Sequence, residues 1–341
     1  MGVEVKELEE YNGKHWDRLI ESSPQATAFH QFDWLKIMEK HTDSQLILLA
    51  GFDGEEIFAV VPFFYEEKFG GLFRKLTSPP YPTGVPYLGP VFPHSHRWGK
   101  SGWERKSIQF QKGLDKYIRS RVKPHVVSIC TSTALRDVRP FLWSGYDALP
   151  RYTYISEVSP LSLAWSRVSS STRRSIRRAE ETISEFEQGD QEDYGFLIDS
   201  LERRYGEQGI QFDLSKDYLN DVYDQFSPSQ LKVFVCRHSE SIIGGLITLV
   251  YKDTISFWLG GVRPKNSKID VNAFIFWKTL QWADQREIKY FDLLGANTPS
   301  ISNFKSKLGF DLKTYFWVEK SSFLYKTATK VLSLYAKWIR L

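Results

Sequence analysis

A lysine just beyond the end of a strand-like segment is the residue of this chain best suited to acyl-group chemistry. Residues 290–294 predict a strand that closes on Gly295, followed by a turn and a brief helix that carries Phe304 and Lys305. The aromatic ring would anchor this helix while the ammonium reaches a cleft above the sheet. There it would stabilise negative charge developing on an acyl oxygen or a phosphate. From spacing alone, the simpler interpretation is that Lys305 is a solvent-exposed helix lysine like Lys307.

Two cation–aromatic pairs lie on other helix-like segments. Trp34 and Lys36 belong to the second predicted helix, and Arg204 with Tyr205 ends a later one. Either pair could bind a diphosphate through charge-assisted hydrogen bonds. In isolation, a cation beside an aromatic residue near a helix end more often belongs to the surface than to a site.

The densest basic cluster is a predicted helix with five arginines between residues 167 and 178. Ser169 and its neighbours would cap this helix. Its basic face could meet RNA, anionic lipid or a nucleotide phosphate, although a solvated helical face is the simpler explanation.

Two glycine pairs interrupt apolar strand-like runs, Gly244-Gly245 and Gly260-Gly261. Glycine weakens a strand and often marks a bulge or a close backbone approach. Splayed strands that receive an acyl donor would explain both pairs. Packing against a bulky neighbour such as Trp258 explains them equally well.

Composition argues against several other functions. The formal net charge is only +4, which does not indicate nucleic-acid binding. Cys130 and Cys236 each end an apolar run, as buried reduced thiols of a cytosolic protein do. His94 and His96 have no third ligand nearby in sequence, so we expect no metal. No apolar run reaches about 18 residues and the first residues lack a signal-peptide core, so we expect a cytoplasmic location.

An internal repeat favours two domains. The 341 residues, 42% of them apolar, exceed one ordinary core. Residues 46–59 read as strand, turn and strand, and residues 231–244 repeat this pattern at a constant offset of 185. Gly145 and Gly309 each precede an aspartate and then a strand at an offset of 164, so the halves would have unequal insertions.

Alternating helices and strands with antiparallel hairpins predict mixed α/β halves. Helices are expected at 15–21, 31–40, 103–121, 133–142, from 160, 167–183, 191–206, 215–226 and 271–286. Strands are expected as a hairpin over 46–65 and at 125–130, 151–158, 231–237, 241–251, 254–261 and 288–294. Prolines and glycines predict a loop at 77–93.

Residues 323–341 form an amphipathic pattern with apolar residues on one face and lysines and an arginine beside it. This composition suits a helix lying in a membrane interface. It equally suits a terminal helix docked on its own domain or on a partner.

Seven short segments occur in the order and spacing of one protein family. They are 29–36, 171–179, 202–206, 242–245, 257–261, 291–295 and 304–305. Together they resemble the FemAB/FemX-type aminoacyltransferases, which add amino acids to peptidoglycan precursors using aminoacyl-tRNA. The resemblance covers nearly the whole chain.

This resemblance implies a fold and a set of site residues. The fold would be α/β with mixed sheets, in two tandem acetyltransferase-like (GNAT-type) domains at 1–159 and 160–322, followed by the basic helix 323–341. Lys36 and Arg204 would hold the diphosphate of a sugar nucleotide, and Trp258 would line the cleft. Lys305 would be catalytic. The neighbours Trp34, Tyr205 and Phe304 would complete the substrate-binding set.

The implied function is transfer of an aminoacyl or acyl group onto an amine of a nucleotide- or lipid-linked cell-envelope precursor. The donor would be aminoacyl-tRNA or acyl-CoA, with no bound cofactor and with peripheral membrane contact through 323–341. Residues 261–272 lack the glycine-rich turn that grips coenzyme A, which weakens that donor. The strand 125–130 lacks an acidic residue that some relatives place at its end, which leaves the acceptor open. The alternatives are an acyl-CoA-dependent N-acyltransferase of envelope polysaccharide synthesis and a non-catalytic membrane-peripheral module.

Overall fold

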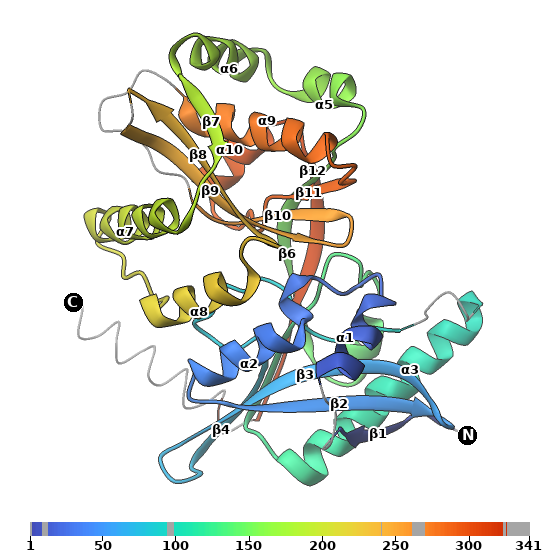
Figure 1. The fold of residues 1–341 in the computed structure, drawn as a ribbon. Helices are drawn as coiled ribbons and strands as arrows, with labels where there is room; N and C mark the ends of the chain where they lie inside the picture. Colours follow the sequence, from blue (N-terminus) through green and yellow to red (C-terminus); the bar gives the residue numbers. More distant parts are fainter. Residues whose placement is uncertain are drawn as a thin grey trace, which may run out of the picture. The chain divides into compact units, whose positions relative to one another are not determined.

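Two compact α/β units make up the chain (Figure 1). The computed structural model describes residues 2–8, 13–93, 99–239, 241–260, 270–322 and 325. Unit 1 comprises Met1–Pro150 and Tyr315–Leu341, and unit 2 comprises Arg151–Thr314. The mixed α/β class expected from the sequence is confirmed.

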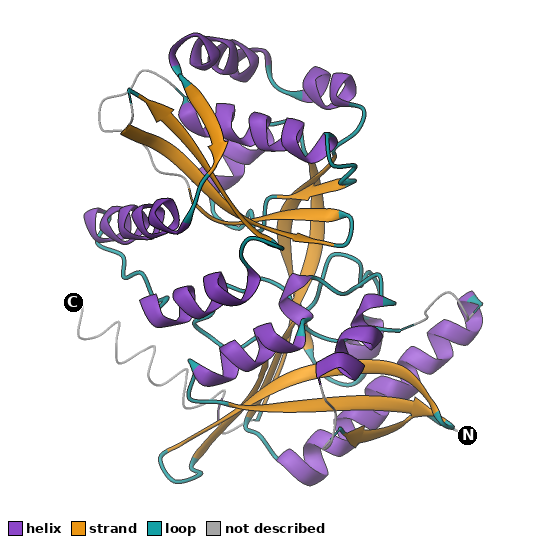
Figure 2. Cartoon of the chain, in the orientation of Figure 1, coloured by secondary structure: helices purple, strands orange, loops and turns teal. Residues whose placement is uncertain are grey.

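Unit 1 is a sheet in the order β1-β2-β3-β4-β5-β12 with helices on both faces (Figure 2). Its strands are β1 (Glu4–Glu7), β2 (Gln45–Asp53), β3 (Glu56–Lys68), β4 (Phe73–Ser78), β5 (Val126–Cys130) and the end of β12 (Asp311–Ser321). Its helices are α1 (Gly13–Glu21), the 3-10 turn η1 (Ala28–His30), α2 (Phe32–Lys40), α3 (Lys100–Tyr117), the π-turn η3 (Ile118–Val122) and α4 (Arg139–Trp143). The central strands β2 and β3 are apolar almost throughout because both of their faces are covered. Ile47 and Leu49 pack with α3 and α4, so the alternate positions face α1 and α2.

Unit 2 is a sheet in the order β6-β11-β10-β9-β8-β7. Its strands are the end of β6 (Asp147–Glu157), β7 (Glu185–Gln188), β8 (Leu231–His238), β9 (Ser241–Tyr251), β10 (Thr254–Gly260) and β11 (Tyr290–Asp292). Its helices are α5 (Leu161–Arg167), α6 (Ser170–Thr182), α7 (Gln191–Glu207), α8 (Lys216–Phe226), α9 (Val271–Asp284) and α10 (Pro299–Ser306). Helices α6 and α9 pack on one face of the sheet through Ile176 and Phe274.

Four helices of unit 2, α6, α7, α8 and α9, begin at residues whose side chains cap them. The side chains of Ser169 and Ser215 accept hydrogen bonds from backbone N–H groups of α6 and α8. Asp190 forms a capping box with Asp193 at the start of α7, and Asp270 caps α9. Each cap satisfies an N–H group that the first helical turn leaves without an intrahelical partner.

The internal repeat extends to the register of the strands. In unit 1 Leu49 pairs with Val61, and in unit 2 Phe234 pairs with Leu246, 185 residues later on both strands. The register shift between Gly51 and Phe52 recurs at the same offset in β8. A bulge at equivalent positions of two hairpins is a feature of a duplicated scaffold, because bulges are retained within a fold family.

The last strand of each unit comes from an unexpected part of the sequence. β12 pairs with β5 of unit 1, and the end of β6 pairs with β11 of unit 2. The expected division at 159/160 lies close to the observed one at 150/151, whereas residues 315–322 belong to unit 1 instead of the second domain. The expected helix 323–341 falls outside the described residues except for Tyr325. None of the described helices is both long and apolar enough to cross a bilayer.

Three strands were not expected from the sequence, namely β1, β4 and β7. β1 and β7 have four residues each and carry polar side chains, so they show no apolar periodicity. They form because the neighbouring strands β2 and β8 offer unpaired backbone groups at the edge of each sheet.

Candidate active site

The two parallel strands β10 and β11 separate part of the way along the sheet of unit 2. They pair only from Thr254 with Tyr290 to Ser256 with Asp292. β10 then continues alongside β9 as far as Gly260, with a register shift between Phe257 and Leu259. β11 ends at Asp292, so the part of β10 past Ser256 has no strand partner on its β11 side among the described residues.

A left-handed turn begins where β11 ends. Leu294 has φ +42° and Gly295 has φ +75°. The turn is held by Asp292, whose Oδ1 accepts hydrogen bonds from the backbone N–H of Leu294 at 3.0 Å and from the Thr153 hydroxyl at 2.7 Å. A leucine in this region of φ is uncommon and persists because its surroundings hold it.

Lys305 satisfies the carbonyl groups that this turn leaves without strand partners. Its Nζ donates to the carbonyl oxygens of Leu293, Leu294 and Gly295 at 2.5, 2.9 and 2.7 Å. The residue is only 5% exposed, whereas Lys307 on the next turn is exposed. The ammonium has three N–H donors, so the three carbonyls use all of them.

Burial makes the charge of Lys305 adjustable near neutral pH. Removal from water lowers the pKa of this lysine from 10.5 to about 8, and the nearby Asp292 carboxylate acts in the opposite direction. The ammonium remains the main form at pH 7. A cation in a site that excludes water stabilises developing negative charge more strongly than one in solvent does.

Aromatic rings form the wall beside this ammonium. Nζ of Lys305 lies 5.5 Å from the ring centre of Phe257, which contacts Phe276 at 4.9 Å. Phe276 in turn contacts Phe304 at 5.8 Å. Phe304 therefore anchors α10 in the core of unit 2, as the sequence predicts, and Pro299 begins the helix.

The corresponding opening in unit 1 is filled by the chain itself. β4 pairs with β5 only as far as Ser78. Beyond this point the N–H of Leu88 donates to the carbonyl of Cys130 at 2.9 Å, and Val91 exchanges two hydrogen bonds with Val60 of β3. The segment 88–91 thus takes the place of a longer β4 and bonds to both β3 and β5, whereas β10 and β11 of unit 2 are not paired with each other beyond Ser256 and Asp292.

The remaining predicted site residues are dispersed. In unit 1, Trp34 is fully buried against Phe29 at 5.1 Å, and Lys36 points to solvent in an ion pair with Glu39. In unit 2, Tyr205 contacts Phe212 on the outer end of α7 beside the half-buried Arg204.

Trp258 lies on the other face of β10 from the Lys305 cluster. It is 7% exposed and contacts Tyr218 of α8, whereas Phe257 packs with α9. Within unit 2 the structure therefore brings Phe304 and Lys305 together but places Trp258 apart from them.

Two other sequence features have structural explanations. A Cβ on Gly245 would lie 2.3 Å from Leu197, and one on Gly260 would lie 2.6 Å from the carbonyl oxygen of Gly245, so close approach explains these glycines. In the basic cluster, Arg173 donates to the carbonyls of residues 165, 166 and 168, and Arg177 lies 5.8 Å from the Trp165 ring. His94 and His96 lie outside the described residues.

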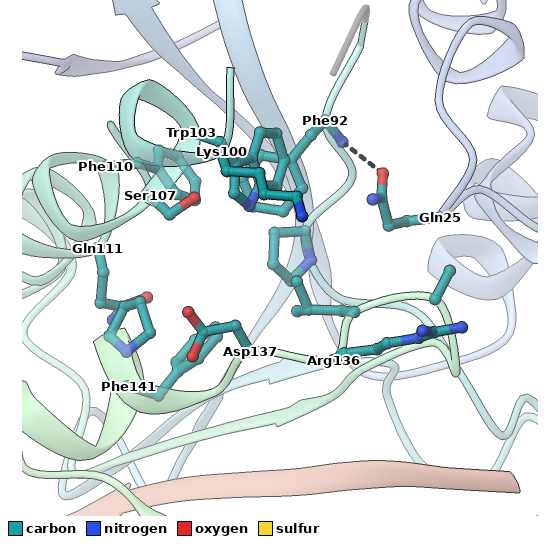
Figure 3. A pocket seen from close by; sticks show the side chains of 14 residues that line it. Gln25, Phe92, Lys100, Trp103, Ser107, Phe110, Gln111, Arg136, Asp137 and Phe141 are labelled. Atoms are coloured by element: carbon teal, nitrogen blue, oxygen red, sulfur yellow. Dashed lines mark hydrogen bonds between the residues drawn. The ribbon is translucent and has the colours of Figure 1, made fainter. Parts of the chain in front are cut away.

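A cavity of about 340 Å³ in unit 1 contains none of the predicted site residues (Figure 3). Aromatic side chains of α3 and α4, with Phe92, form its walls, and Lys100, Arg136 and Asp137 lie around it. Asp137 is engaged by Arg139 through two hydrogen bonds of 2.9 Å. This cavity lies on the α3/α4 face, away from α2.

Sequence reasoning missed Asp292, Phe257 and Thr153. In the sequence Asp292 is assigned only to a predicted strand. An aspartate directly before a turn is nevertheless a recognised signal for a hydrogen bond to the backbone two residues on. The contributions of Phe257 and Thr153 depend on strand pairing, which no local pattern reveals.

Comparisons with known proteins agree with this architecture. A model of the acetyltransferase (GNAT) domain matches residues 166–306. The crystal structure of FemX is similar with a TM-score of 0.68 at 12% identity, over 91% of this chain and 96% of that one. The fold is therefore a tandem acetyltransferase-like fold of the FemX type, which confirms the resemblance inferred from the sequence. No curated protein matches the chain.

Two further solved structures share the fold. One is the C-terminal domain (DUF2156) of a putative lysylphosphatidylglycerol synthetase from Agrobacterium fabrum, with a TM-score of 0.57 at 14% identity over 95% of this chain and 96% of that one. The other is a tandem GNAT protein from the clavulanic acid biosynthesis pathway, with a TM-score of 0.52 at 8% identity over 94% and 98%. Acyl transfer is the chemistry that this fold class supports.

Proposed function

We propose that this protein transfers an aminoacyl or acyl group onto an amine of a nucleotide- or lipid-linked cell-envelope precursor, and that the donor binds in unit 2. The separation of β10 from β11, with the Lys305 ammonium at that point, is the observation that carries the proposal. The GNAT match over residues 166–306 supports the same unit. The similarity to a putative lysylphosphatidylglycerol synthetase supports an aminoacyl donor and an envelope acceptor.

The reaction needs no protein nucleophile. The acceptor amine attacks the donor carbonyl, a C–N bond forms, and the C–O bond of an aminoacyl ester or the C–S bond of a thioester breaks. The leaving group gains a proton and the amine loses one. Because the donor is already activated, holding the two reactants in line supplies much of the rate.

Lys305 would act on the charge that develops during this step. Its three donors are occupied in the structure, so one N–H must exchange the carbonyl of residue 293, 294 or 295 for a substrate oxygen. With a pKa of about 8, the ammonium can also give up a proton near neutral pH. A lysine in this position serves both as a clamp on the turn and as a source of positive charge.

The acceptor contacts remain proposals. In unit 1 Lys36 would bind a phosphate group, and in unit 2 Arg204 would do so, with Tyr205 and Trp258 packing against the attached groups. Trp34 is fully buried, so we expect it to act only by fixing α2 and hence Lys36.

Substitution of Lys305 tests the reaction. Lys305→Met should lower turnover by roughly 100-fold or more. It should also lower the free energy of unfolding by about 1–3 kcal/mol, because three carbonyls lose their donor. Lys307→Met, on the exposed neighbour, is the matched control and should change neither quantity. Wild-type turnover in a folded Lys305→Met protein would remove this lysine from the mechanism.

The donor can be identified by thermal shift and hydrogen exchange. Acetyl-CoA and an aminoacyl-tRNA are titrated separately, since only a donor that binds the native state raises the melting temperature. The true donor should slow exchange at residues 256–260 and 293–296. Protection at 88–91 of unit 1 instead would contradict the placement of the donor. Stabilisation by neither donor would favour a non-catalytic binding module.

A further inference from the structure

The hairpin between β3 and β4 presents two large apolar side chains to solvent. Lys68 pairs with Phe73 across the strands, so residues 69–72 form the connecting loop. Phe69 is 79% exposed and Leu72 is 81% exposed, more than any other large apolar residue that the structure describes. Single exposed apolar side chains are ordinary, whereas two at one tip form a projecting apolar point.

The backbone of this tip is strained so that these side chains project. Phe69 has φ +55°, followed by Gly70 and Gly71 at +61° and +86°. A bulky residue in the left-handed region costs free energy and is uncommon away from functional sites. Two glycines follow, yet the strained position nearest the strand carries phenylalanine. Because the exposed ring of Phe69 gains little from packing within the chain, its place at this strained position indicates a contact with another molecule.

Basic side chains surround the tip. Residues 65–75 and 119–125, which lie next to one another because His125 donates its N–H to the carbonyl of Arg74, contain six lysines and arginines against two glutamates. Their net charge of +4 equals that of the whole chain. Arg121 and Lys123 are exposed and form no ion pair among the described residues. An apolar point with exposed cations beside it is complementary to an anionic lipid surface, since the aromatic ring and alkyl groups enter the interface while the cations meet the headgroups.

Tyr325 lies against the same hairpin. Its ring stacks on Phe73 at 5.6 Å, and Phe73 lies 6.5 Å from the His125 ring. Tyr325 is the one residue that the structure describes within 323–341, the segment that the sequence predicts to be basic and amphipathic.

We propose that the β3–β4 tip docks the protein on an anionic bilayer, with Phe69 and Leu72 inserted and Arg121 and Lys123 at the headgroups. Stable attachment to membranes commonly takes two weak signals, here apolar insertion of the tip and contact of its neighbouring cations with the headgroups. The tip lies wholly in unit 1, so docking does not depend on the transfer site of unit 2. Its failure and the failure of the proposed function are therefore separately measurable.

Vesicle flotation of the full chain tests the proposal. Wild type should float with vesicles of phosphatidylcholine and phosphatidylglycerol and stay at the bottom with phosphatidylcholine alone. Phe69→Ser combined with Leu72→Ser should lower recovery at least fivefold, and Arg121→Glu with Lys123→Glu should lower it comparably. Leu149→Ser, at a residue that is 57% exposed in the same unit, is the control and should float like wild type. Recovery of the double serine variant at the wild-type level would overturn the proposal.

Insertion can be read out directly at the tip. Cys130 and Cys236 are buried, so a polarity-sensitive thiol dye should label Phe69→Cys selectively. Its emission should shift to the blue on addition of anionic vesicles, whereas the dye on Leu149→Cys should not respond. An unchanged emission at the tip would contradict insertion. Loss of concentration-dependent self-association in the serine variant, without any wild-type flotation, would assign the tip to a second copy of the chain instead.

Discussion

Lys305 holds the backbone turn after β11 in addition to its proposed catalytic role. Its Nζ donates hydrogen bonds to three successive carbonyl groups. These bonds fix the left-handed turn at 294–295 and thereby the end of β11. Asp292 holds the same turn from the other side through the N–H of Leu294. The charge and the shape of the site are thus coupled through one side chain, and a substitution that removes the charge also disturbs the turn.

The pKa of Lys305 predicts opposite effects of pH on activity and stability. Its pKa is about 8 in the folded chain and 10.5 in the unfolded chain, so between these values only the unfolded state holds the proton. Stability attributable to this lysine therefore rises with pH across that window and is lost as pH falls through 8. Relative to Lys305→Met, the wild type should gain roughly 3 kcal/mol between pH 8 and 10.5 in urea unfolding.

Turnover should move the other way. If the ammonium is required, kcat/KM should decline above pH 8 while the protein becomes more resistant to urea. A pH profile of kcat/KM measured on the same samples checks this. Activity that stays level to pH 10 would show that the charge of Lys305 is not needed for the reaction.

At the scale of elements, the two units share one strand arrangement but differ at the ends of their central strands. Both hairpins, β2–β3 and β8–β9, keep the same register and the same bulge. They diverge after the fourth strand, where unit 1 inserts residues 88–91 and unit 2 leaves the ends of β10 and β11 apart. The duplicated scaffold thus explains the fold of each unit, and a short local difference decides whether a chain segment lies against the ends of these strands.

Gly260 of β10 leaves no room for a larger side chain. It has φ +137°, and an added Cβ would lie 2.6 Å from the Gly245 carbonyl oxygen and 2.9 Å from Leu246 Cα. Gly260→Ala should lower the free energy of unfolding by about 3 kcal/mol, from backbone strain together with overpacking. Gly206→Ala on α7, where the space is open, should be neutral or stabilising. Equal melting temperatures for the two variants would contradict this account.

At the scale of the whole molecule, unit 1 is completed by a strand from outside its main sequence segment. β12 follows unit 2 in sequence, yet Val318 is fully buried in the core of unit 1 and Lys320 binds Asp115 of α3 at 2.7 Å. β5 would be an exposed edge without this strand. The stability of unit 1 therefore depends on residues near the end of the described chain.

Val318→Ala tests this dependence. Loss of two buried methyl groups should cost about 2 kcal/mol. Hydrogen exchange should accelerate at residues 126–130 of β5, which pair with β12, and much less at 231–238 of β8. Acceleration confined to unit 2 would contradict the assignment of β12 to unit 1.

The sequence by itself determined most of the elements, one of the helix caps and the duplication. Apolar runs, glycines and capping residues are local signals, so the hairpins, most helices and the offset of 185 were predictable, as was the strand–Gly–helix unit that carries Lys305. The polar strands β1 and β7 were not, because edge pairing supplies their hydrogen bonds rather than any apolar period.

Tertiary structure alone decided which lysine is buried, which opening is filled and where the last strands go. Lys305 and Lys307 are alike in sequence, and only the left-handed turn at 294–295 gives one of them three carbonyl partners. The filling of unit 1 by 88–91 and the pairing of β12 with β5 join residues far apart in the chain. Such contacts depend on which backbone groups remain unpaired once the sheets have formed, and local patterns carry no record of that.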